Sequence, residues 1–115
     1  MSKQEIKIVT KIIREVALYL MMHGHKDFTF ETQNTPDTTT LIITLNHSKP
    51  EFIQSMQEKM NRERQIEIET YGWELIGDID QKNELEVLSL LIDSMDVEYK
   101  DNQTIITLIR TNQYL

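Results

Sequence analysis

His23-Gly24-His25, followed by Asp27, is the one place in the sequence where metal-binding side chains gather. A catalytic zinc needs three protein ligands around an open position, and the H-E-x-x-H spacing that supplies them from one helix is absent. Both histidines fall where a helix is expected to end, and a histidine there complements the negative end of the helix dipole. We therefore expect these histidines to be structural and predict no metal site.

Acidic residues are abundant from Glu67 to Asp101 and offer candidates for a general acid, a general base, or a cation site at Asp78 and Asp80. An acid–base pair needs one desolvated carboxylate, and nothing in the pattern indicates the pocket that would desolvate it. The stretch 78–82 also lacks the D-x-D-x-D-G pattern of a calcium loop. A solvated acidic face is therefore the expectation.

Nucleophilic and phosphate-binding motifs are missing from the chain. It has no cysteine, so disulfides, thiolate nucleophiles and thiolate metal sites are excluded. No serine lies in a G-x-S-x-G turn, and the three glycines cannot form either of the common phosphate-binding loops. We predict no cofactor.

Tyr71 and Trp73 lie in the densest aromatic segment and include the only tryptophan. Such residues pack in a core or, when partly exposed among acids, anchor a protein partner or a second copy of the chain. Both interpretations stay open, and the second makes Tyr71 and Trp73 candidate interface residues.

The distribution of charge excludes several partner classes. The net charge is −7, and residues 67–101 hold eleven acids against two lysines, which disfavours a nucleic-acid partner. Lys3, Lys7 and Lys11 recur every four residues, but no aromatic residues interleave with them, so we expect a solvated helix face. No apolar run approaches the ~18 residues that cross a bilayer, and no signal-peptide pattern is present, so we predict a cytoplasmic protein with no membrane partner.

Hydrophobic periodicity in the first half of the chain predicts a helix, a hairpin and a second helix. The first helix should cover residues 3–23, and its apolar face should consist of Ile6, Val9, Ile13, Ala17 and Leu20. Alternation at Phe28 and Phe30, a break at 34–37 and a β-branched run at 40–45 predict a β-hairpin. Ser48 and Glu51 form a capping-box pattern, so the next helix should begin near residue 49.

The second half is harder to assign in its middle. Residues 62–79 mix strand-like and helix-like patterns, and we favour a short helical or irregular segment at 71–76. A further helix should start near Asp80, with an apolar face made by Leu85, Leu88, Ile92 and Met95. Residues 97–109, with Asp101-Asn102 at the centre, predict a second hairpin.

These elements predict a single domain over residues 1–115 with the order αββα(α)αββ. About four mostly antiparallel strands need one covered face, and the helices supply that cover, so the expected fold class is α/β (α+β), a two-layer sandwich.

Both ends of the chain resemble a known superfamily. Residues 85–99 and 104–108 are similar to the last helix and hairpin of the histidine-kinase-type ATPase (GHKL) superfamily, especially its anti-sigma-factor kinases, where "GLxLIxxLMD", "VEV" and "GTTVxLxK" follow one another. Glu15, Tyr19, His23 and Gly24 lead into a hairpin as the E-x-x-x-N and H-G elements of that superfamily do. The resemblance implies the same fold.

The resemblance does not extend to the chemistry of the superfamily. Glu15 matches the catalytic base, but Tyr19 replaces the Mg²⁺-holding Asn, and Asp78 does not begin the Asp-x-Gly-x-Gly element. Carboxylates at Glu84 and Glu86 replace phosphate-side glycines, which adds like charge where a triphosphate would lie.

The leading hypothesis is a non-catalytic cytoplasmic protein-interaction or regulatory module without bound nucleotide, whose partner is another protein or a second copy. One alternative is a divergent ATP-binding protein or kinase with Glu15 as base and a cofactor site at Tyr19, Asp78 and Asp80. Another is an unrelated α+β domain.

Overall fold

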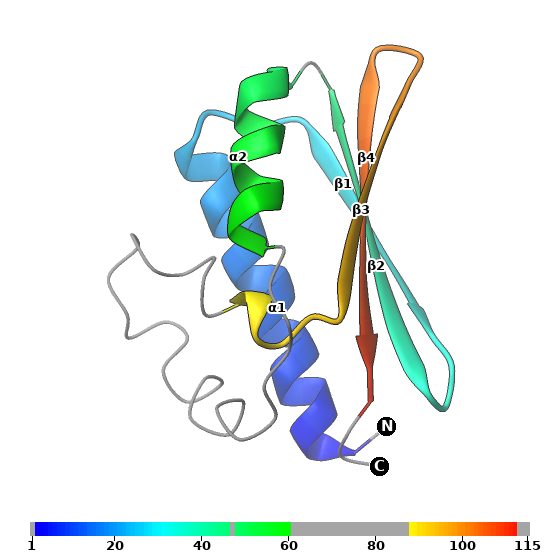
Figure 1. Cartoon of the computed structure of the whole chain (residues 1–115). Coiled ribbons are helices and arrows are strands. Elements are labelled where there is room, and N and C mark those ends of the chain that lie inside the picture. The colour runs from blue at the N-terminus through cyan, green and yellow to red at the C-terminus, as the bar shows by residue number, and fades with distance from the viewer. Residues whose placement is uncertain (1, 47, 61–87, 113–115) are drawn as a thin grey trace.

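The computed structural model describes residues 2–46, 48–60 and 88–112, which form an α+β fold with two helices and one open sheet of four antiparallel strands. Both helices lie on the same face of the sheet (Figure 1). The two-layer arrangement and the antiparallel sheet agree with the sequence-based prediction.

Helix α1 spans Lys3–Met22 and has a defined stop at each end. Ser2 is its N-cap, and the Ser2 hydroxyl accepts a hydrogen bond from the Glu5 N–H at 3.1 Å. At the other end the His25 N–H donates to the Leu20 carbonyl and the Gly24 N–H to the Met21 carbonyl, at 2.9 and 3.2 Å. This is a Schellman motif, and it requires the positive φ of 87° that Gly24 adopts.

The buried face of α1 differs from the predicted one. Val9 and Leu20 lie in the core as expected, but Ile6 is 49% exposed. Ile8, Ile12 and Val16 are buried instead. The sequence pattern misses this face because the face also contains two carboxylates, Glu5 and Glu15, and a hydrophobicity pattern places such residues in solvent.

The first hairpin is confirmed. Strand β1 covers Phe28–Asn34 and β2 covers Thr38–Asn46, paired so that Phe30 lies opposite Ile43. The Thr35 hydroxyl accepts hydrogen bonds from the Asp37 and Thr38 N–H groups at 3.3 and 2.9 Å, which closes the turn.

Helix α2 spans Pro50–Met60 and buries Ile53, Met56 and Met60. The predicted Ser48 cap is wrong. The Ser48 hydroxyl instead lies 2.5 Å from the Thr104 hydroxyl, and the Lys49 carbonyl accepts the first bonds from the Phe52 and Ile53 N–H groups. Proline suits the first helical position because it has no N–H to leave unpaired there.

The helix predicted to run through Met95 ends earlier. Residues 88 and 89 are helical, the chain turns at 90 and 91, and Met95 lies in strand β3, Ser94–Lys100. The Asp93 N–H donates to the Ile109 carbonyl at 2.8 Å, and the Asp93 carboxylate accepts from the Thr111 N–H. Hydrogen bonding to the last strand therefore begins at Asp93, directly after the turn. The residues that follow consequently pair in the sheet and do not extend the helix. Asp80 and Leu85 lie outside the described residues.

The second hairpin is confirmed as well. Strand β3 pairs with β4, Gln103–Thr111, through a two-residue turn at Asp101 and Asn102. Both turn residues have positive φ, 52° and 66°, as a tight hairpin between right-twisted strands requires.

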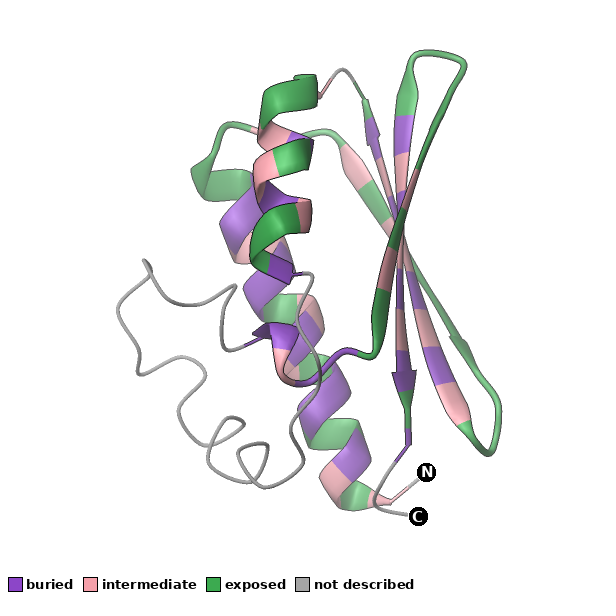
Figure 2. Cartoon of the chain, in the orientation of Figure 1, coloured by how far each residue is buried: buried purple, intermediate pink, exposed green. Residues whose placement is uncertain are grey.

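The two hairpins join through their second strands, so the sheet order is β1-β2-β4-β3. Burial alternates along β2 and β4: Leu41, Ile43 and Leu45 face the helices, as do Ile106 and Leu108 (Figure 2). The opposite face of these two strands is half-buried and carries only isoleucine and threonine between residues 40 and 44 and between 105 and 109. No helix of the described ranges covers that second face.

Candidate functional site

Glu15 and Tyr19 are the site residues from the sequence that the structure describes, and they lie one turn apart on α1. Glu15 is fully buried, at 0% exposure, and Tyr19 is 8% exposed. The other candidates, Asp78 and Asp80 for a cofactor and Tyr71 and Trp73 for an interface, lie outside the described residues.

The Glu15 carboxylate is held from one side only. Its Oε1 accepts a hydrogen bond at 3.1 Å from Nη1 of Arg14, whose side chain is 64% exposed. Its Oε2 is buried and has no hydrogen-bond partner among the described residues. A buried carboxylate oxygen without a donor is destabilising by about 1 to 3 kcal/mol, so Glu15 is retained at a cost to stability.

This cost gives a direct prediction. Replacing Glu15 by Met keeps a long side chain, removes the unpaired oxygen and adds apolar surface to the core, so we expect Glu15→Met to raise the free energy of unfolding by about 1 kcal/mol. Urea titration followed by circular dichroism measures it. Glu58→Met, at an exposed position of α2, is the control and should change stability by less than about 0.5 kcal/mol. A loss of stability in Glu15→Met would contradict the interpretation.

The Tyr19 ring belongs to an aromatic cluster at the end of α1. Its centroid lies 5.6 Å from that of Phe52 on α2, stacked at 24°, and 4.2 Å from the His23 ring. Burial raises the pKa of the Tyr19 hydroxyl. The phenol therefore stays neutral. A neutral phenol is a poor ligand for Mg²⁺, which favours carboxylate and carbonyl oxygens.

His23 has the helix-end role that the sequence indicated. It is the C-cap residue of α1, and its Nδ1 lies 2.8 Å from the Tyr19 carbonyl oxygen. A carbonyl only accepts, so Nδ1 carries the proton and Nε2 stays available as an acceptor in the neutral ring. The ring thus satisfies one of the last carbonyls of the helix.

A cavity of ≈ 510 Å³ opens beside this cluster. It lies between the end of α1, the loop to β1, the last residue of β2 and the residue before α2. Its lining is His23, Gly24, His25, Lys26, Asp27, Asn46, Lys49 and Phe52. Sequence reasoning considered the histidines and Asp27 but missed Lys49 and Phe52, because only folding brings residues 23–27 and 46–52 together.

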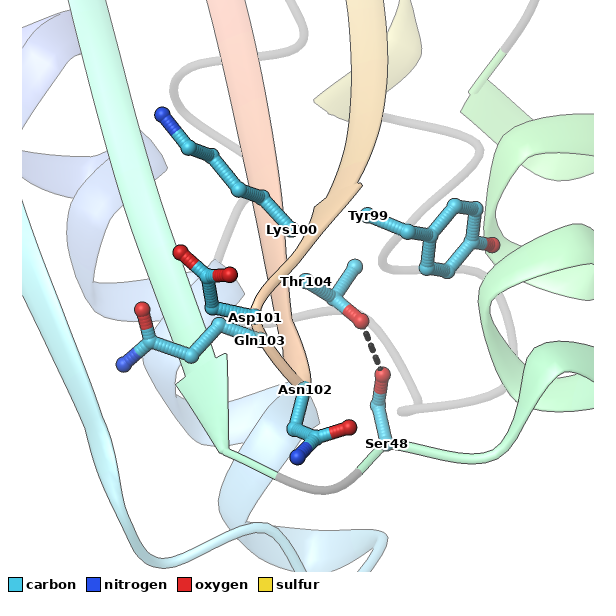
Figure 3. A pocket seen from close by; sticks show the side chains of 7 residues that line it. All are labelled: Ser48, Tyr99, Lys100, Asp101, Asn102, Gln103 and Thr104. Atoms are coloured by element: carbon cyan, nitrogen blue, oxygen red, sulfur yellow. Dashed lines mark hydrogen bonds between the residues drawn. The ribbon is translucent and has the colours of Figure 1, made fainter.

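A second hollow, of ≈ 380 Å³, lies at the tip of the β3–β4 hairpin beside Ser48. The Ser48 and Thr104 hydroxyls point toward each other, whereas Tyr99 and Lys100 point to opposite sides of the hairpin (Figure 3). This divergence follows from strand alternation. The lining therefore offers no group of side chains that converges on a ligand.

Glu5 and Arg110 form a buried ion pair that the sequence analysis did not identify. Arg110 Nε and Nη2 donate to the two Glu5 carboxylate oxygens at 2.9 and 2.8 Å, and Nη1 donates to the Leu91 carbonyl at 2.8 Å. Both side chains are at most 3% exposed. The pair ties the first turn of α1 to β4 and to the chain that precedes β3.

None of the described helices is long and apolar enough to cross a membrane. Among the described residues, no three histidine, aspartate or glutamate side chains are grouped so that they could hold a metal ion. Comparison of the chain with protein-family models, curated proteins and solved structures gives no match.

Proposed function

We propose that this chain is a non-catalytic, cytoplasmic protein-binding or regulatory module, built on a degenerate histidine-kinase-type ATPase fold, that works without nucleotide. The observation that carries the proposal is the burial of Glu15 and Tyr19 in the packing of α1. A general base must reach the proton it removes, and a Mg²⁺ ligand must reach the ion. Neither side chain is open to solvent.

The helix–hairpin–helix order at the start of the chain and the closing hairpin support the resemblance to that ATPase fold. The neutral Tyr19 phenol, packed against Phe52 and His23, supports the absence of a magnesium-bound nucleotide.

The uncovered face of the sheet is the surface that we assign to the partner. Its centre is formed by Ile42, Ile105 and Ile109 and the threonines between them, and all are half-buried by their neighbours. An apolar centre of this kind is typical of the middle of a protein interface. We call this side of the sheet the open face. It consists of the residues of the four strands that alternate with the helix-facing ones.

The rim of the open face selects the chemistry of the partner. Strand register places Glu31 of β1 and Asp96 and Glu98 of β3 on it, with Lys100 as the only basic residue of these two strands on that side. We infer a protein partner with an apolar centre and basic flanks, because opposite charges at the rim orient an encounter. A second copy of the chain would set acids against acids, so a different protein is favoured over a homodimer.

The nucleotide part of the proposal is tested by isothermal titration with ATP and Mg²⁺. We expect no saturable heat at millimolar ATP that requires Mg²⁺ or Glu15. Saturable binding that is lost in Glu15→Gln and kept in Glu58→Gln would overturn the proposal and establish the divergent ATP-binding alternative. The unpaired Oε2 of Glu15 is the observation that favours this alternative, since a group kept buried at a cost is sometimes kept for chemistry.

The docking part is tested with Ile42→Glu and Glu98→Lys on the open face and Lys59→Ser on exposed α2 as control. A true partner copurifies with the chain from a cytosolic extract at fixed stoichiometry. It should be lost with either open-face variant and retained with Lys59→Ser, and added salt should weaken its binding. A partner indifferent to both open-face variants would contradict the assignment. Self-association that Ile42→Glu abolishes, seen by analytical ultracentrifugation, would replace the hetero-partner by a second copy.

A further inference from the structure

The cavity at the end of α1 differs in charge from the rest of the protein. Lys26 and Lys49 both line it, and Asp27 is the only acid among the described residues of the lining. The whole chain carries −7. Neither lysine has an ion-pair partner in the part of the chain that the structure describes. The cavity is therefore a local positive region in an acidic protein, which attracts small anions.

The cavity also has an aromatic wall. The Phe52 and His25 ring centroids are 4.4 Å apart, with an interplanar angle of 33°, and the His23 ring lies 5.4 Å from Phe52. Flat rings pack on such a surface in offset or tilted arrangements. Small-molecule sites combine apolar rings with a few placed polar groups in this way, and ≈ 510 Å³ is within their usual size.

A polar group completes the lining. The Asn46 amide lines the cavity and adds both a donor and an acceptor. The Nδ1 of His25 is buried away from solvent and has no hydrogen-bond partner among the described residues. A ligand with a hydroxyl or N–H beside its ring would meet the Asn46 amide.

We propose that this cavity binds a small organic anion that carries a flat ring, with Lys26 and Lys49 neutralising its carboxylate or phosphate and the Phe52–His25 wall packing against its ring. The site is separate from the open face, which lies on the other side of the sheet from the helices (Figure 1). Glu15 is not one of the residues that line the cavity, so the site is also separate from the candidate base. The proposal therefore stands or falls independently of the protein partner.

The experiment is a titration of the ¹⁵N-labelled full chain, followed by amide and histidine ring resonances. Benzoate and phenyl phosphate supply ring and charge, inorganic phosphate supplies charge alone, and benzyl alcohol supplies the ring alone. We expect saturable shifts at residues 23–27 and 46–52 with benzoate, phenyl phosphate or both, and weaker binding of inorganic phosphate and benzyl alcohol. The two ring anions distinguish a carboxylate ligand from a phosphate one.

Substitutions test whether the two lysines and the aromatic wall each contribute to binding. Lys26→Ser and Lys49→Ser should each lower the affinity for the ring anions about fivefold, as expected for the loss of one partly solvated charge. Lys59→Ser, at an exposed lysine outside the cavity, should leave the affinity unchanged. Phe52→Leu should weaken ring anions and leave inorganic phosphate unaffected. Because Phe52 also packs against Tyr19, His25→Gln provides a second test of the wall at a half-buried loop position.

Two results would overturn the proposal. One is the absence of saturable shifts at residues 23–27 and 46–52 with any ring anion at millimolar concentration. The other is binding that Lys59→Ser weakens as much as Lys26→Ser and Lys49→Ser do, which would show general attraction of anions to surface lysines.

Discussion

Arg110→Ala is expected to lower the free energy of unfolding by about 3 to 5 kcal/mol, the largest loss that we predict for one substitution. Arg110 donates to both oxygens of Glu5 and to the Leu91 carbonyl, and it is almost fully buried. Its removal leaves the Glu5 carboxylate in the interior without these donors. Glu5→Ala should cost a similar amount, because it leaves a charged guanidinium in the interior without the Glu5 carboxylate.

The double variant separates the cost of removing one partner from the net contribution of the pair. Glu5→Leu with Arg110→Met removes both charges and keeps apolar volume, so it should recover most of the loss. Urea unfolding of the parent, Glu5→Leu, Arg110→Met and the double variant closes the cycle and measures the coupling. Arg110→Lys keeps one charge and replaces Arg110→Ala if that variant does not fold. Losses that simply add in the double variant would contradict the account. An exposed control, Glu58→Ala, should stay within about 0.5 kcal/mol of the parent.

Ile43→Ala is expected to cost about 3 kcal/mol, whereas Ile42→Ala, one residue earlier, should cost less than about 1 kcal/mol. Ile43 is fully buried beneath the helices, and Ile42 points to the open face and is half-buried. The two substitutions remove the same atoms from the same strand. Their difference therefore measures how one-sided the sheet is.

Thermal unfolding and urea titration of both variants provide the measurement. Equal losses would mean that the second face is also covered, and the assignment of the open face to a partner would then fail. If Ile42→Ala is nearly neutral in isolation but weakens partner binding, Ile42 serves the interface and not the fold.

The hairpins show what local sequence predicts well. Alternation around Phe28 and Phe30 and the Asp101-Asn102 pair predicted two hairpins, and the structure contains both. Each signal lies within a few residues, because a turn that tolerates positive φ sets the register of its own two strands. The same holds for Gly24, which marks the end of α1.

The buried carboxylates show where local patterns fail. The periodicity of α1 placed Ile6 in the core, and the structure exposes Ile6 and buries Glu5 and Glu15. Glu5 is buried because Arg110, 105 residues later in the chain, supplies its donors. No pattern on one helix contains that information. Met95 was likewise assigned to a helix because the helical period continued, while pairing with β4 is a long-range event.

The sequence by itself determined the first helix, the two hairpins, the excess of acid and the absence of thiol chemistry. Only the tertiary structure decided how the hairpins join, with β2 beside β4, and which residues meet between α1 and α2. The physical reason is range. Turns, caps and strand alternation act over a few residues, whereas the Glu5–Arg110 pair and the cavity of Lys26, Lys49 and Phe52 arise only when distant segments pack together.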